Sequence, residues 1–141
     1  MTADSELFPY VEVDPTRGSL SRFPYLPLSL QLVHEITDSG PLDTGSSINV
    51  LPFDVGLRLG AAWERETTTV TLTGNLRDVE AKALVTMAKV AGFPPVRLAF
   101  AWTKSNDVPV LLGQVNFFME FDVCFFRAES AFEVRPRKSG K

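Results

Sequence analysis

The chain has 141 residues, of which 45% are hydrophobic, and its net charge at pH 7 is −3. This length suits one domain with a modest core, and the mildly acidic charge argues against nucleic acid or an anionic membrane as the main partner. The single cysteine excludes an internal disulfide, and no apolar run approaches the length of a membrane span. Because the N-terminus also lacks the basic and then apolar plan of a signal peptide, we expect a cytoplasmic protein.

The two ends of the chain read as segments outside the main domain. Residues 1–23 begin acidic and then contain prolines, a glycine and several serines. We therefore expect a flexible extension there, either loosely held or wrapped on the surface. A domain is expected over residues 24–136, followed by a short basic tail at residues 137–141.

Apolar and polar residues alternate from Leu26 to Ile36, which is the period of a half-buried strand. Residues 37–40, Thr-Asp-Ser-Gly, then read as a turn. Asp38 is therefore interpreted as a hairpin residue, although Asp-Ser-Gly has the same form as the motif that follows it. Two such motifs so close together on one chain cannot place their carboxylates face to face.

The motif Asp43-Thr44-Gly45-Ser46 follows an apolar residue and precedes a short apolar run. This pattern is typical of a tight loop that presents one carboxylate at the end of a strand. Gly45 allows backbone freedom and close approach, and the Thr44 hydroxyl can tie the loop to a neighbouring backbone or to a second copy. Asp43 is then the reactive group.

Short strand-like and helical patterns follow this loop. Residues 49–51 predict a short strand, and residues 53–60 suit one or two helical turns ended by glycine. Residues 63–73 are β-like, and Gly74-Asn75 is a hairpin signal. Beyond it, apolar side chains alternate as in a strand that leaves water and enters the core, namely Val79, Ala81, Ala83 and Val85.

The last third of the chain predicts further strands. Residues 96–103 alternate clearly, and residues 108–112 read as a buried strand. Residues 114–121 carry apolar side chains at helical spacing, which predicts a short helix. Two final strands are expected over residues 122–127 and 131–135.

The loop motif Asp43-Thr44-Gly45-Ser46 together with Val110-Leu111-Leu112-Gly113 resembles the catalytic loop and the apolar-apolar-Gly element of retropepsin-like aspartic proteases. The resemblance covers roughly residues 24–136. It implies an all-β fold, a small closed barrel with one or two short helices, assembled as a two-fold symmetric homodimer. An alternative is an unrelated small β-barrel in which Asp-Thr-Gly is an ordinary turn.

The resemblance also implies roles for individual residues. Asp43 is expected to be catalytic, with Thr44, Gly45 and Ser46 supporting the loop and holding the substrate backbone. The expected flap over the substrate consists of Leu72, Thr73, Gly74, Asn75 and Leu76. The expected substrate pocket includes Val50, Val108 and Val110, and the element under the loop is Leu111, Leu112 and Gly113.

One such loop supplies one carboxylate, whereas aspartic peptide hydrolysis needs two, one ionised and one protonated. The second carboxylate must then be Asp43 of another copy. We therefore expect an aspartic endopeptidase that acts as a homodimer on peptide or protein substrates. No cofactor and no metal are expected.

Three residues depart from the retroviral pattern. Ser46, Ser47 and Gln114 stand where alanine, aspartate and arginine are usual, so the ion pair near the dimer interface is absent. A Ser46 hydroxyl that donates to the paired carboxylates would favour their ionised form, which predicts an acidic activity optimum. The departures also leave open a catalytically silent module of the same fold that binds peptides or proteins.

Two other residues receive a structural interpretation. Cys124 lies within a predicted strand and is expected to be a small buried apolar residue. His34, the single histidine, has neither the partners of a catalytic triad nor the further ligands of a zinc site.

Overall fold

The computed structural model describes residues 4–138. The strands in this range are β1 (Glu6–Pro9), β2 (Val11–Glu12), β3 (Arg22–Phe23), β4 (Tyr25–Gln31), β5 (Glu35–Pro41), β6 (Asn49–Leu51), β7 (Ala81–Lys89), β8 (Val96–Thr103), β9 (Phe121–Phe126) and β10 (Ala131–Pro136). The α-helices are α1 (Phe53–Arg58) and α2 (Phe117–Glu120), and the 3-10 helices are η1 (Pro15–Ser21), η2 (Trp63–Arg65), η3 (Gly74–Leu76) and η4 (Arg127–Glu129). The fold is thus mostly β, as the sequence predicted.

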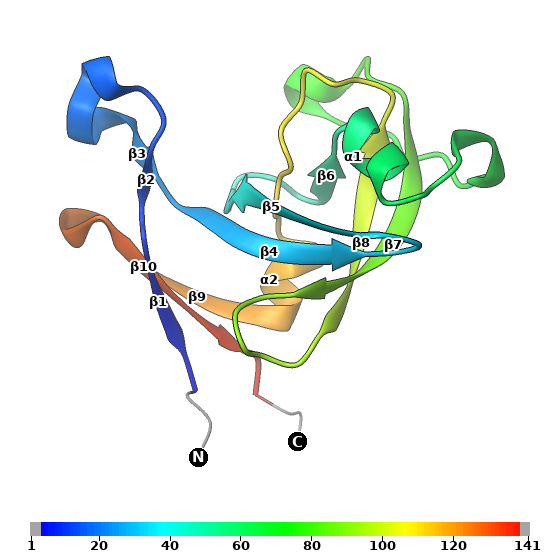
Figure 1. Cartoon of the computed structure of the whole chain (residues 1–141). Helices are drawn as coiled ribbons and strands as arrows, with labels where there is room; N and C mark the ends of the chain where they lie inside the picture. The colour runs from blue at the N-terminus through cyan, green and yellow to red at the C-terminus, as the bar shows by residue number, and fades with distance from the viewer. Residues whose placement is uncertain (1–3, 139–141) are drawn as a thin grey trace.

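A five-stranded sheet in the order β5-β4-β7-β8-β6 forms the body of the molecule (Figure 1). A three-stranded sheet, β1-β10-β9, lies beside it, and a two-stranded ribbon, β2-β3, extends away from it. The main core is built from the five-stranded sheet, α1, α2 and the inner face of the three-stranded sheet. Its largest fully buried side chains include Trp102, Phe117, Phe121, Phe132 and Leu98. In residues 4–138, no helix has the length and apolarity needed to cross a membrane.

The expected closed barrel is not formed within the described residues. The edge strands of the large sheet are β5 and β6. In the described residues, residues 42–50 meet residues 111–115 only through isolated bridges, which join Leu42 with Leu112, Ile48 with Val115 and Val50 with Leu111. Residues 108–112, expected to be a buried strand, therefore contribute single pairs. Pro109 has no N–H with which to continue a ladder, which is one reason that no regular strand develops there.

The turn expected at residues 37–40 is wrong. The chain reverses earlier, because the Leu59 carbonyl accepts hydrogen bonds from the N–H groups of both Val33 and His34. Residues 35–41 then form β5, in which Asp38 lies opposite Leu28 in mid-strand. Thr37 and Ser39 lie on the exposed face of this edge strand, whereas Asp38 is half-buried on the other face.

The hairpin expected around Gly74 is present, but its first arm is irregular. After η2, the Thr68 carbonyl accepts from Ala83 N–H (2.8 Å) and Val70 N–H donates to the Ala81 carbonyl (3.0 Å). At the tip, Gly74 has φ of +64° and opens η3, a conformation that glycine adopts without strain.

The sequence predicted which alternate side chains of the second hairpin strand face the core, and this prediction is correct only at the start of the strand. In β7, Ala81 is buried, but farther along Leu84, Thr86 and Ala88 are the buried side chains. Val85, expected in the core, is 46% exposed. The buried side changes just after Ala83, where the hydrogen bonds to the first hairpin arm end, although β7 pairs with β8 from Ala81 onward.

Part of the expected N-terminal extension is a paired strand. β1 pairs with β10 from Glu6 to Pro9, and Phe8 stacks on Phe132 with ring centroids 5.3 Å apart. These residues are therefore not loosely held. The helix expected over residues 114–121 is limited to α2.

Cys124 is exposed and not buried as expected. In β9 the inward-facing positions are those of Phe121 and Val123. Because side chains alternate along a strand, Cys124 shares the outer face with Asp122, which pairs with Arg135 there (3.3 Å).

An aromatic cluster joins α1 to the large sheet. The Trp102 ring stacks on Phe53 (5.6 Å between centroids) and meets Trp63 edge to face (5.1 Å). The indole Nε1–H of Trp102 donates to the Phe53 carbonyl (3.0 Å). Gly56 of α1 lies so close to this indole that a Cβ there would overlap the ring. The cluster thus depends on a glycine at one contact point.

Replacing Gly56 with alanine is expected to lower the free energy of unfolding by about 2 kcal/mol, because the added methyl group overpacks the Trp102 contact. Urea unfolding followed by tryptophan fluorescence measures this change. Gly92→Ala is the matched control, because no described atom lies within 4 Å of a Cβ at that position. An unchanged stability of Gly56→Ala would contradict the tight contact.

Candidate active site

Asp43 lies just after β5, on a loop that the backbone holds in place. Its N–H donates to the Leu112 carbonyl (2.9 Å), and its own carbonyl accepts from Ser46 N–H (3.1 Å). The carboxylate oxygen Oδ1 accepts from Gly45 N–H (3.0 Å). Asp43 is half-buried, whereas Thr44 and Gly45 are exposed. The loop therefore orients the carboxylate while leaving its surroundings open to a ligand.

Residues 111–115 support this loop along its length. The N–H groups of Gln114 and Val115 donate to the carbonyls of Ser46 and Ser47, each at 2.9 Å. The Gln114 side chain adds a further bond, from Nε2 to the Thr44 carbonyl (2.8 Å). At the position where the resemblance leads one to expect an arginine, this glutamine thus braces the loop of its own chain.

Gly113 lies directly beneath the loop. A Cβ at this position would come within 2.5 Å of the Ile48 carbonyl oxygen and 2.7 Å of the Ser46 carbonyl oxygen. Only a residue without a side chain allows the two segments to approach so closely. Leu112, which precedes it, is fully buried in the main core.

Asn49 connects three segments behind the loop and is itself 0% exposed. Its Oδ1 accepts from Gly113 N–H (2.8 Å), and its Nδ2 donates to the Ala99 carbonyl and to Asn116 Oδ1, each at 3.0 Å. The amide side chain of Asn49 thereby sets the position of Gly113 against β6 and β8. A buried amide must be satisfied in this way, because an unpaired polar group in the interior is costly.

A cavity of about 530 Å³ brings the Asp43 loop and the expected flap together. From the loop and β6 it is lined by Asp43, Gly45, Ser46, Ser47, Ile48 and Val50, and from the hairpin by Val70, Thr71, Leu72, Thr73, Gly74, Asn75 and Leu76. Within the described part of the chain, Asp43 is the one acidic residue in this lining. The cavity therefore presents a single carboxylate opposite a polar hairpin tip.

The base of the hairpin is anchored in a small apolar cluster. Leu72 is 5% exposed and packs with Val50, Ala81, Ala101 and Val108. At the tip, by contrast, Thr73, Gly74 and Asn75 are exposed. The hairpin thus has a fixed base and an exposed tip above the cavity.

Two of the expected pocket valines lie elsewhere. Val108 is buried in the apolar cluster under the hairpin, and it does not line the cavity. Val110 belongs to the main core, where it contacts Gly40 of β5, because a Cβ on Gly40 would lie 2.9 Å from Val110 Cγ1. Of the three valines, Val50 lines the cavity. Leu111 alternates with Val110 and Leu112 and packs against the smaller cluster.

The Ser46 hydroxyl is engaged within the loop. Its Oγ donates to the Ile48 carbonyl (2.7 Å). A hydroxyl has one hydrogen, so in this arrangement Ser46 does not donate to a carboxylate. The expectation of an acidic optimum rested on that donation and has no basis in this geometry.

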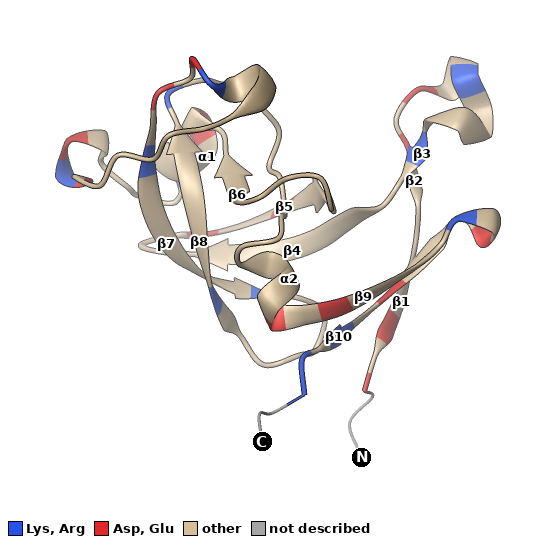
Figure 2. Ribbon diagram, turned by 180° about the vertical axis from the view of Figure 1, so that it is seen from behind, with Lys and Arg blue, Asp and Glu red and all other residues tan. Residues whose placement is uncertain are grey.

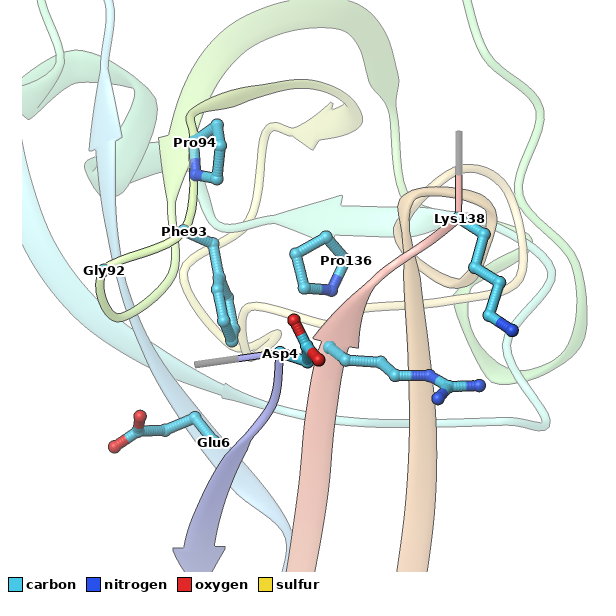
Figure 3. A pocket seen from close by; sticks show the side chains of 8 residues that line it. Asp4, Glu6, Gly92, Phe93, Pro94, Pro136 and Lys138 are labelled. Carbon is cyan, nitrogen blue, oxygen red and sulfur yellow. The ribbon is translucent and has the colours of Figure 1, made fainter. Parts of the chain in front are cut away.

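In the described residues 4–138, neither a cluster of metal-binding side chains nor a second cavity offers comparable chemistry. No cluster of three or more His, Cys, Asp or Glu side chains that could hold a metal occurs in residues 4–138. A second cavity of about 540 Å³ lies between the start of β1, the turn after β7 and the end of β10 (Figure 3). Its lining mixes Asp4 and Glu6 with Arg135 and Lys138 around Phe93, and the sequence singled out none of these residues.

A solved protein structure has a similar fold. The chain is similar in structure to a retropepsin-like aspartic protease from Rickettsia conorii, with a TM-score of 0.62 over 95% of this chain and 94% of that chain, at 14% sequence identity. No protein-family model matches the chain, and no curated protein matches it. The chain is therefore similar in fold to a retropepsin-like aspartic protease, which argues against the alternative of an unrelated small β-barrel.

The sequence did not predict the supporting roles of two residues, Asn49 and Gln114. Asn49 was read only as part of a short strand, although a lone amide in the apolar run Ile48–Leu51 is a signal for a buried hydrogen-bonding role. The bond from Gln114 to Thr44 has no comparable signal, because an exposed glutamine can point in many directions.

Replacing Asn49 with alanine is expected to lower the free energy of unfolding by about 3 kcal/mol, because Gly113 N–H and the Ala99 carbonyl lose their buried partner. Chemical denaturation measures the loss. The control is Asn75→Ala at the exposed hairpin tip, for which we expect a change within about 0.5 kcal/mol. Equal stabilities of the two variants would contradict the role given to Asn49.

Proposed function

We propose that the protein is an aspartic endopeptidase that acts as a two-fold homodimer with one Asp43 from each copy. The observation that carries this proposal is the cavity in which the Asp43 loop faces the hairpin residues 70–76. The similarity in fold to an aspartic protease supports it. The single carboxylate in the cavity lining explains why a second copy is needed.

In the proposed dimer the two carboxylates lie a few ångströms apart and share one proton, because two adjacent negative charges are unfavourable. The ionised carboxylate accepts a proton from a water molecule as that water attacks the peptide carbonyl carbon. The protonated carboxylate donates a hydrogen bond to the carbonyl oxygen and later helps to protonate the leaving amine. The hydrogen bonds around Asp43 serve this chemistry by fixing the direction of each carboxylate.

The proposed substrate is an extended peptide that lies between the loop and the hairpin. Thr44, Gly45 and residues 73–75 are exposed, so the peptide could pair as an added strand with the backbone groups there that do not already bond within the loop or the hairpin. The cavity lining also carries large apolar side chains, which favour apolar residues beside the cleaved bond, namely Ile48, Val50, Val70, Leu72 and Leu76.

A second candidate function is a peptide-binding module without catalysis. It is supported by the fact that loop and hairpin form the cavity within one chain. A single copy therefore has the means to hold a peptide, although it offers one carboxylate for chemistry. Cleavage that depends on Asp43 separates the two candidates.

The decisive assay is cleavage of denatured protein and of apolar-rich peptides by purified wild type and Asp43→Asn. We expect at least about a thousandfold loss of cleavage in Asp43→Asn, because this variant cannot supply the ionised partner of the dyad. Asp38→Asn is the matched control, since Asp38 carries the neighbouring Asp-Ser-Gly but lies in mid-strand in β5. Equal cleavage by wild type and Asp43→Asn would exclude the proposed enzyme, whereas peptide binding without cleavage would favour the module.

A further inference from the structure

The segment from β2 through η1 to β3, residues 11–23, leaves the body of the molecule next to the Asp43 loop. We call it the N-terminal arm. Its last residue is Phe23, and the following Pro24 accepts a hydrogen bond through its carbonyl from Leu42 N–H (2.9 Å). Leu42 immediately precedes Asp43. From this base the arm extends away from the five-stranded sheet (Figure 1).

The arm exposes large apolar side chains to solvent, although nothing in its own fold requires them. Four of its large apolar side chains are exposed, namely Val11 (44%), Val13 (49%), Leu20 (68%) and Phe23 (43%). In the described structure β2 and β3 pair only with each other, and an isolated two-stranded ribbon is marginally stable in water. A bond from Arg127 Nη1 to the Arg22 carbonyl (2.7 Å) ties the arm to the β9–β10 hairpin but leaves these side chains uncovered.

The charges of the arm are compatible with a contact to a second copy of this chain. It carries two acidic and two basic residues, Glu12, Asp14, Arg17 and Arg22, and Figure 2 shows the two signs interspersed with uncharged residues there. Glu12 and Arg22 already pair across the ribbon (3.5 Å). An arm without net charge is not repelled by a second copy of this chain, whose net charge is −3.

We propose that the N-terminal arm packs against the second copy that completes the active site, and this inference rests on the proposed function. A partner whose Asp43 comes within a few ångströms of this Asp43 must stand beside Leu42 and Pro24, which is the base of the arm. The exposed side chains of the arm then lie over the partner. By two-fold symmetry the arm of the second copy packs against this copy in the same way, so the contact is made twice in each dimer.

The test compares Leu20→Glu, and separately Phe23→Glu, with the control Val33→Glu. Val33 is as exposed as Leu20, at 68%, but it lies in the turn between β4 and β5, at the end of these strands away from the arm. Sedimentation equilibrium over a range of protein concentrations gives the dimer dissociation constant of each. We expect at least about a tenfold increase for both arm variants, because a charge is buried without a partner, and none for Val33→Glu.

Far-UV circular dichroism and melting temperature verify that each variant is folded, and cleavage assays over the same concentrations complete the test. If the arm variants dimerise as tightly as wild type, the role of the arm is wrong, whatever the enzyme does. If they dimerise weakly but no form cleaves peptide, the proposed function fails and the arm proposal stands. A wild type that remains monomeric at every concentration overturns both.

Discussion

The close contact between residues 111–115 and the loop that begins at Asp43 is the constraint on which the site depends. Two segments distant in sequence are joined there by backbone hydrogen bonds, by the Gln114 side chain and by the buried amide of Asn49. The contact exists because Gly113 has no side chain to hold the segments apart. It determines where the Asp43 carboxylate points, and therefore what the cavity beneath the hairpin can bind.

The alternation of apolar and polar residues predicted strands correctly where burial of one face decides the structure. The strand over residues 96–103 appeared with its expected bounds, because alternation records which face is buried. Asp38 was misjudged, since Ser, Asp and Gly occur both in turns and on exposed edge strands, and the pairing partner decides between them. The roles of Asn49 and Gln114 arise from contacts across long stretches of sequence, and no local pattern records such contacts.

A single chain supplies a well-held acid, a hairpin above it and a cavity between them, yet it supplies one carboxylate to that cavity. The proposed chemistry makes association part of the active site, so that stability and activity both depend on protein concentration. The uncovered apolar side chains of the N-terminal arm lie beside this incomplete site. In the proposed homodimer, the second copy would both supply the second carboxylate and cover the exposed apolar side chains of the arm.

Mixing wild type with Asp43→Asn at constant total protein concentration tests most directly whether each copy provides one acid. After subunits have exchanged, only dimers with two intact carboxylates cleave, so cleavage should fall with the square of the wild-type fraction, to about one quarter in an equal mixture. A linear fall, to about one half, would show that each copy works by itself and would contradict this account.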